Sequence, residues 1–384
     1  MNPIDELRAA RPAHLGDTPV DERTRAAELS YAMSRPRSAR RKRRTVRPVW
    51  GFSLVGAAAA ATAVAVVVSG TGGTTPRAPA AAPATVTSST PTSSTPKVKL
   101  SARDILLTAA AKAARQPAGT GAYWHTASVQ RTLFAAEDAD YLVMDQQRNE
   151  GWTPSATGGD QWGSTRPLGA RPATAADEEA WKQAGSPAEI PVKVPGKPRP
   201  LTLSTSPGKA STSHSPLVDG DKVFWLGRNV TMKDLRGLPS DPAKLKAWLL
   251  RSYEGHGTES SSDPMPANIW LFTVSVGLIT DMPVTPQVRG AAFRMLADLD
   301  TVDVIENVTD AEGRQGTAVA IEERIKGSGV LENRLIFDQA TGRGLANENV
   351  VVKPGGFQSD FEPGTVWNSQ AVLEAGWTDS KPSS

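Results

Sequence analysis

The sequence predicts an α+β protein in which one transmembrane helix is followed by an extracytoplasmic antiparallel sheet with packed helices. Three observations lead to this fold class. An uncharged apolar run of 19 residues follows a dense basic cluster near the N-terminus. A Pro-, Ser-, Thr- and Ala-rich stretch then separates this run from the rest of the chain. The remainder alternates between segments with strand periodicity and segments with helix periodicity, as α+β domains do.

The apolar run covers residues 50–68 and reads WGFSLVGAAAAATAVAVVV. At about 1.5 Å per residue it approaches the ~30 Å hydrocarbon core of a bilayer. A cleaved signal peptide and a buried core helix are the alternatives, and a signal peptide usually has a much shorter basic region before it. We expect a retained anchor, with these residues in it: Trp50, Leu54, Val55, Val64, Val66, Val67 and Val68.

The basic cluster before the apolar run predicts the orientation in the membrane. Residues 1–49 contain 12 Lys or Arg and 6 Asp or Glu, a net charge of +6, whereas the whole chain carries only +3. The positive-inside rule therefore places the N-terminus in the cytoplasm and the C-terminal domain outside a plasma membrane that is crossed once. The residues that determine this topology are Arg40, Arg41, Lys42, Arg43, Arg44 and Arg47.

Composition divides the chain into a basic cytoplasmic tail (1–49), the transmembrane helix (50–68), a linker (69–98) and an extracytoplasmic domain (99–384). The linker has five prolines and thirteen hydroxyl residues in thirty positions, which is typical of a flexible stalk. The tail is too short to fold alone, so it is either disordered or a peptide that folds on a partner. The chain has no Cys, which excludes disulfides, a lipoprotein anchor and Cys-ligated metals.

Helix signals and strand signals alternate in the domain. Ser101 and Asp104 form a capping box that opens a helix over 102–115. Three alternating runs predict an antiparallel meander, at 123–134, 140–152 and 161–168. A short helix at 177–184 and a Pro- and Ser-rich irregular stretch at 185–215 follow.

The second half of the domain begins with a strand at 223–226 and a helix that Asp241 caps and Pro242 opens. Residues 269–279 fit either a strand or a helix, and their apolar spacing favours a helix. Another helix is expected at 286–299. Two hairpins end the chain, one pairing 302–308 with 317–322 and the other pairing 329–338 with 345–352.

Several stretches, including GAYWHT at 121, LPSDPAKLKAWL at 238, PVTPQVRGAAFRMLADL at 283 and LIFDQATGRGL at 335, give the chain a family resemblance. It resembles actinobacterial single-span membrane proteins of unassigned function. The resemblance implies that the ectodomain is similar to the half-barrel of LolA-type lipoprotein carriers, in which a curved antiparallel sheet wraps helices around an apolar cavity. Such proteins are often encoded near extracytoplasmic-function sigma factors, which implies a regulatory or envelope-sensing context.

The sequence contains none of the common catalytic motifs. The four His residues are His14, His125, His214 and His256, and no two lie at metal-ligand spacing. HExxH, GxSxG and the GxxxxGK[ST] phosphate loop are missing from the sequence. We therefore predict no catalytic, cofactor-binding or metal-binding residue, and no enzyme. Trp152, Trp162 and Trp181 lie in Gly- or charge-flanked segments and could border a ligand cavity, whose other residues stay unassigned.

The leading hypothesis is a membrane-anchored extracytoplasmic protein that senses or binds an apolar group, either lipid-like or from an envelope protein, between sheet and helices. A different class is an anti-sigma regulator that holds a sigma factor through the cytoplasmic tail. The third hypothesis is a cell-wall hydrolase. No nucleic-acid partner is expected, because the basic cluster is better explained by topology and anionic lipid.

Overall fold

The computed structural model describes residues 101–194, 199–225, 228–258, 264–325 and 329–382. The predicted tail, the apolar run from Trp50 to Val68 and the linker lie outside these residues. The anchor and the basic cluster therefore remain predictions.

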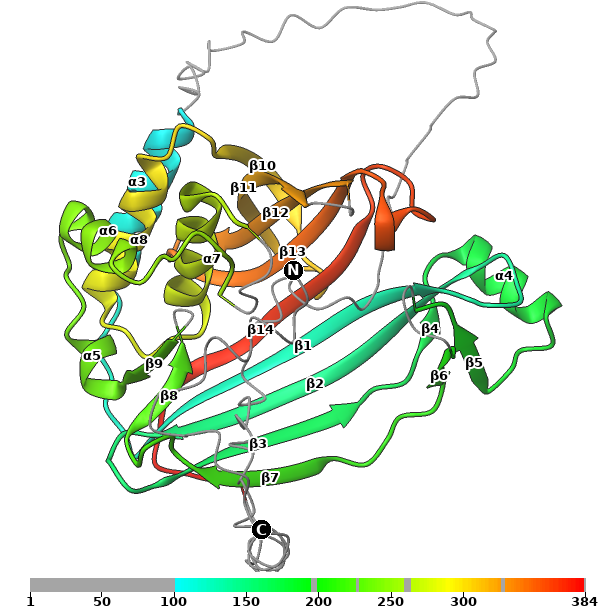
Figure 1. Cartoon of the computed structure of the whole chain (residues 1–384), viewed down its shortest axis with the longest axis horizontal. Helices are drawn as coiled ribbons and strands as arrows, with labels where there is room; N and C mark the ends of the chain where they lie inside the picture. The colour runs from blue at the N-terminus through cyan, green and yellow to red at the C-terminus, as the bar shows by residue number, and fades with distance from the viewer. Residues whose placement is uncertain (1–100, 195–198, 226–227, 259–263, 326–328, 383–384) are drawn as a thin grey trace, which may run out of the picture. The chain divides into compact units, whose positions relative to one another are not determined.

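One ten-stranded sheet dominates the described residues (Figure 1). Its pairing order is β10-β11-β12-β13-β14-β1-β2-β3-β7, β4 pairs with β2, and every pairing is antiparallel. The strands are β1 (Tyr123–Ala135), β2 (Leu142–Pro154), β3 (Asp160–Pro167), β4 (Arg171–Pro172), β7 (Ser211–Pro216), β10 (Asp303–Thr309), β11 (Gln315–Ile325), β12 (Gly329–Asp338), β13 (Arg343–Lys353) and β14 (Val366–Thr378).

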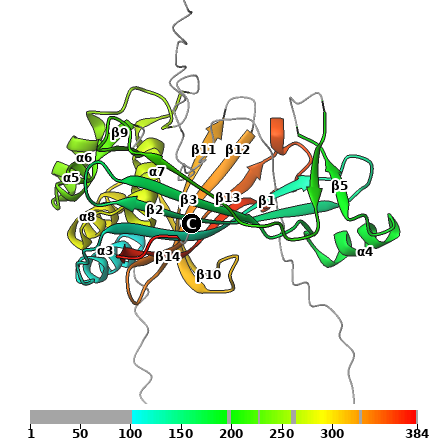
Figure 2. The same ribbon diagram turned by 90° about the horizontal axis from the view of Figure 1, so that it is seen from below.

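Strand β14 joins two sheet halves that are far apart in the sequence. It pairs with β13 on one side and with β1 on the other, so the hairpins of the C-terminal half and the meander of the N-terminal half form one sheet. The meander and both hairpins were predicted, but β14 was not. Figure 2 shows that the strands of the two halves cross at a steep angle, as accumulated twist requires.

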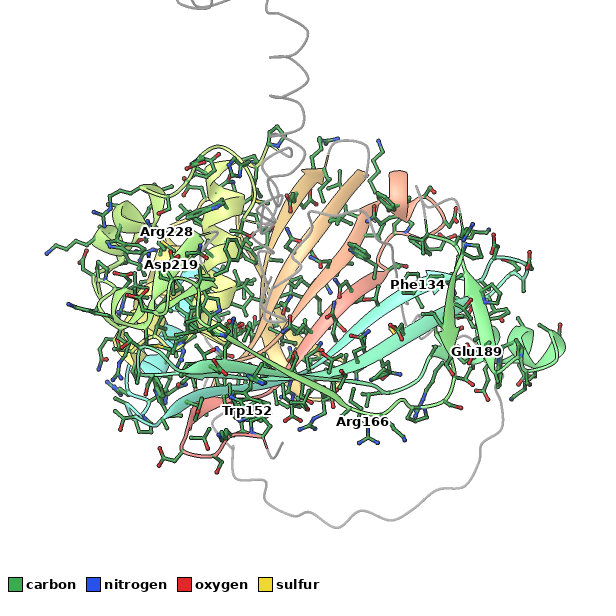
Figure 3. All side chains as sticks on the ribbon, turned by 60° about the horizontal axis from the view of Figure 1, so that its bottom comes forward. Phe134, Trp152, Arg166, Glu189, Asp219 and Arg228 are labelled. Carbon is green, nitrogen blue, oxygen red and sulfur yellow. The ribbon has the colours of Figure 1, made fainter. Side chains whose placement is uncertain are left out.

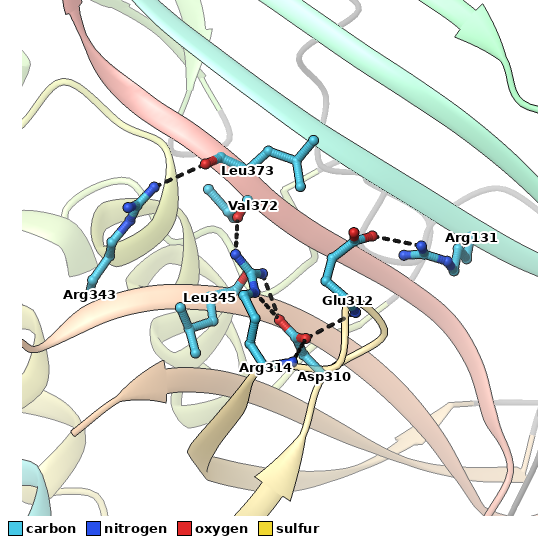
Figure 4. Close-up of polar contacts among 8 residues, drawn as sticks. All are labelled: Arg131, Asp310, Glu312, Arg314, Arg343, Leu345, Val372 and Leu373. Atoms are coloured by element: carbon cyan, nitrogen blue, oxygen red, sulfur yellow. Dashed lines mark hydrogen bonds and ion pairs between the residues drawn. The ribbon is translucent and has the colours of Figure 1, made fainter. Parts of the chain in front are cut away.

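Two β-bulges beside β14 are stabilised by arginine side chains (Figure 4). Leu373 is the extra residue opposite β1, and Leu345 is the extra residue between β12 and β13. Arg314 donates to the carbonyl oxygens of Val372 and Leu345, both at 2.8 Å, and Arg343 donates to the carbonyl of Leu373 at 3.1 Å. A bulge leaves backbone groups without ladder partners, and these guanidinium groups satisfy them.

Most of the described helices pack at one end of the sheet, whereas α4 lies at the other end (Figure 1). Helix α7 has 11 of its 14 residues buried, which explains why its sequence is apolar on all sides. Helix α8 packs against both α7 and α3, and these helices share a hydrophobic core with Val319, Leu335 and Phe337 of the sheet (Figure 1). The helices are α3 (Ala102–Ala113), α4 (Ala175–Gln183), α5 (Met232–Arg236), α6 (Pro242–Leu250), α7 (Ala267–Thr280) and α8 (Pro286–Ala297), with a 3-10 turn at Gly356–Gln358.

The predicted caps are confirmed. Ser101 and Asp104 form the capping box of α3, and Asp241 accepts from the amide of Lys244 at the start of α6. The prediction of an irregular stretch at 185–215 is wrong, because these residues include one strand pair and most of β7. That pair, β5 (Glu189–Val192) and β6 (Leu201–Ser204), packs with Phe134 and Val143 in a second core. A further pair joins β8 (Lys222–Trp225) and β9 (Arg228–Thr231).

The predicted fold class is wrong. The described residues form a mostly antiparallel sheet with a few short helices, instead of an α+β protein with one transmembrane helix and a LolA-like half-barrel. None of the described helices combines the length and hydrophobicity needed to cross a membrane, and α7 is the longest at 14 residues. The LolA-like description is corrected with it, and the transmembrane and single-pass descriptions find no support among the described helices. The apolar residues of the described helices are used to cover the sheet.

Candidate functional site

A pocket of about 270 Å³ opens where the sheet meets the helices. Its lining comes from the segment after α3, the start of β1, the end of β14 and the first turn of α8. These segments are distant in the sequence, and β14 brings them together by pairing its end with the start of β1. The pocket therefore exists only when the two halves of the sheet have joined.

Two tryptophans form one wall of the pocket. Trp124 and Trp377 are directly opposite each other in the β1–β14 ladder, and their rings meet edge to face with centroids 5.3 Å apart. The indole N–H of Trp124 donates to the main-chain carbonyl of Asp281, which fixes the ring orientation. Gly119 lies against the wall, and a Cβ there would approach Trp377 to 2.9 Å. The wall is thus a preformed apolar surface of the kind common in ligand sites.

Two arginines give the pocket a positive charge. Arg289 of α8 donates to the side-chain oxygen of Gln116 at 3.1 Å, whereas its buried Nε has no hydrogen-bond partner among the described residues. Arg236 places its guanidinium 5.2 Å from the centre of the Trp377 ring. A buried polar group without a partner is costly, so the Nε of Arg289 indicates a position for a missing acceptor.

The charge of Arg289 persists at neutral pH. Burial lowers the pKa of this guanidinium to about 10, and the neighbouring Asp281 opposes that effect. Burial also raises the pKa of Asp281 well above its usual range, which favours its neutral form. The first turn of α8, which begins after Thr285 with Pro286, adds the positive end of a helix dipole. An anionic group is therefore favoured in this pocket.

The pocket is suited to binding. Its lining combines an apolar aromatic wall with a positive group but supplies no carboxylate, histidine or cysteine side chain. Thr285 is the lining hydroxyl, and it already accepts the amide of Val288 as the helix cap. Among the residues that the structure describes, no group of three or more potential metal ligands gathers. The arrangement can hold an amphipathic anion without covalent chemistry.

The tryptophans predicted to border a cavity lie elsewhere. Trp152 and Trp162 are on the sheet away from this pocket, and Trp181 in α4 donates to the carbonyl of Pro187. Reasoning from the sequence missed Trp124 and Trp377. The glycines that precede Trp124, in the run GTGAYW, were an available signal of close packing, because Gly119 lies against the ring of Trp377.

The histidines of the described residues also have defined places. His125 lies in β1, as its sequence context predicted, within 3.4 Å of Glu374 and 3.7 Å of Glu150. His214 was expected in a flexible loop but lies in strand β7. His256 forms an isolated antiparallel bridge with Pro264 and approaches Glu254 to 3.4 Å.

Comparisons of the chain with protein-family models, with curated proteins and with solved structures found no match. The geometry of the pocket is therefore the basis on which its function is assigned.

Proposed function

We propose that the domain binds a small amphipathic acid in the pocket between sheet and helices. The apolar body of the ligand packs against Trp124 and Trp377, and its acidic group accepts from Arg289. The observation that carries this proposal is the buried Nε of Arg289, which lacks a partner and belongs to a residue lining a pocket with a tryptophan wall. Non-covalent binding of this kind is the first step that a sensing domain needs.

The volume limits the ligand. Pockets for drug-sized molecules measure about 300–1,000 Å³, so a pocket of about 270 Å³ suits a smaller molecule. An aromatic or short-chain carboxylic acid fits this space better than a diacyl lipid. The polar contact is charge-assisted, and such hydrogen bonds contribute about 1.5–3 kcal/mol.

A matched pair of ligands tests the proposal. Isothermal titration calorimetry with 3-phenylpropionate and its neutral amide compares the same apolar body with and without the charge. We expect the amide to bind at least about ten-fold more weakly, because it loses the charge-assisted bond to Arg289. Equal affinity of the acid and the amide would contradict the assignment of Arg289.

Two variants measure separately what the charge of Arg289 and the tryptophan wall contribute to binding. Arg289→Met retains much of the side-chain volume but removes the charge, so it should abolish the preference for the acid. Trp377→Ala removes part of the wall and should weaken both ligands to a similar extent. The matched control is Arg251→Met, since Arg251 stacks on Trp248 outside the pocket. Loss of binding in this control would show that the effect is not specific to the pocket.

A further inference from the structure

A row of four rings crosses the opposite face of the sheet. His125, Trp152, Trp162 and His214 are directly opposite one another across β1, β2, β3 and β7. His125 stacks on Trp152 with centroids 4.5 Å apart, and Trp162 stacks on His214 with centroids 4.4 Å apart. Because His125 follows Trp124 in one strand, the row faces away from the tryptophan wall of the pocket.

The position of the row is visible in Figure 3, where Trp152 and Arg166 lie below the strands and Phe134 lies above them. Trp152 is buried, Trp162 is partly exposed and His214 is exposed, so access to the row improves toward the edge strand β7. The accessible part of the row is therefore the pair formed by Trp162 and His214.

Carboxylates surround the row. Asp160 lies 2.7 Å from Nδ1 of His214, and Glu374 and Glu150 approach the two ring nitrogens of His125. Arg148 is the neighbouring cation, and its Nε is paired with Glu150 at 2.5 Å. Aromatic faces attract cations through their quadrupole, and nearby carboxylates reinforce this preference.

The chain places a cation of its own on this surface. The ammonium of Lys381 lies 5.5 Å from the centre of the Trp162 ring. The segment that carries Lys381 is positioned by Asp379, which accepts from the backbone amide of Ala122 at 2.9 Å. Lys381 is itself exposed, so its contact with Trp162 is open to competition from solvent.

We infer that the Trp162 end of the ring row is a binding site for a lysine side chain of an extended partner peptide, and that Lys381 occupies it within the chain. The ligand class follows from the ammonium of Lys381 on the Trp162 ring and from the Asp160 carboxylate beside His214. The C-terminal segment is attached to the end of β14, so its lysine has an effective concentration of about millimolar, and a partner must compete with it.

The test uses the full chain and two synthetic peptides. One peptide has the sequence of residues 378–384, TDSKPSS, and the other has uncharged norleucine in place of the lysine. The shift of the Trp162 indole N–H resonance reports binding. The Lys381→Ala protein should bind the lysine peptide more tightly than the unmodified protein does, by a factor of one plus the ratio of the effective concentration of Lys381 to the dissociation constant of the peptide. It should not respond to the norleucine peptide.

Substitution of Lys381 leaves the fold intact because the side chain is exposed, so the comparison does not depend on a damaged protein. In the Lys381→Ala background, Trp162→Leu should abolish binding of the lysine peptide, whereas Trp181→Leu, in α4, should not. Equal response to both peptides, or equal affinity of the two proteins for the lysine peptide, would overturn the inference. The outcome is independent of ligand binding in the pocket on the other face.

Discussion

Replacing Arg314 by alanine should strongly destabilise the junction of the sheet halves. The guanidinium contacts the Asp310 carboxylate through Nε at 2.7 Å and supports the carbonyls of Val372 and Leu345 at the bulges (Figure 4). The Asp310 side chain is 0% exposed, so the variant leaves a buried carboxylate without its cation.

The magnitude follows from that geometry. Breaking a buried ion pair by removing one partner costs about 3–5 kcal/mol. The Arg314 side chain is 32% exposed, so water can reach part of the vacated space and the lower end applies. Asp310 also keeps its bonds from the backbone amides of Glu312 and Arg314, both 2.9 Å long. We therefore expect a loss of about 3 kcal/mol in the free energy of unfolding.

Urea denaturation followed by tryptophan fluorescence measures this loss. Arg314→Lys retains the charge but not the planar guanidinium group. Its free energy of unfolding should therefore lie between those of the alanine variant and the unmodified protein. The control is Lys182→Ala, which removes an exposed pair with Glu178 and should leave the free energy of unfolding nearly unchanged. A loss below about 1 kcal/mol for Arg314→Ala would refute the role assigned to this residue.

Three further substitutions test the fold. Burial raises the pKa of Glu348 to about 7 in the folded state from 4.5, so its stabilising effect is full below about pH 4.5 and is lost as pH rises through 7. Glu348→Gln should therefore flatten the pH dependence of stability and add about 2–3 kcal/mol at pH 8, measured by urea denaturation at several pH values. Gly342→Ala should lower the melting temperature more than Gly313→Ala does. Both residues have positive φ, which an alanine rarely adopts. Only at Gly342 would a Cβ also collide with the backbone of α3, 2.5 Å from the carbonyl oxygen of Ala109. Asp241→Ala should cost about 1 kcal/mol by the same measurement, because it removes the cap of α6; no change would contradict the cap.

Local signals in the sequence were sufficient for most elements. The capping box of Ser101 and Asp104 and the Asp241–Pro242 start of α6 act within a few residues, so these helices could be located without knowledge of the tertiary structure. The spacing of apolar residues also identified 269–279 as helix, which the structure confirms as part of α7.

Strand β14 was missed for a physical reason. Strands are recognised by alternation, and the extra residue Leu373 reverses the alternation in the middle of this strand. Trp377 consequently lies on the same face of the sheet as Trp124. A strand with strict alternation of side chains would place it on the opposite face. Strand β7 was missed because its sequence, STSHSP, is polar on both faces at the sheet edge.

The pocket depends on these missed elements. Trp377 comes from β14, and Arg289 appears in the sequence as an ordinary polar residue of an amphipathic helix. Its special role arises only when the end of α3 and the end of β14 meet α8. Positions of this kind cannot be predicted from local patterns, because their environment is made by contacts between distant segments.

The central place of the last strand has a consequence for synthesis. A growing chain leaves the ribosome from its N-terminus, so β1 is available long before β14, and β13 also emerges before it. Until residues 366–378 emerge, each sheet half presents an unpaired edge to other chains. A ribosome that stops short of these residues would therefore release an aggregation-prone pair of half-sheets, so the cell has reason to shield this nascent chain or degrade it.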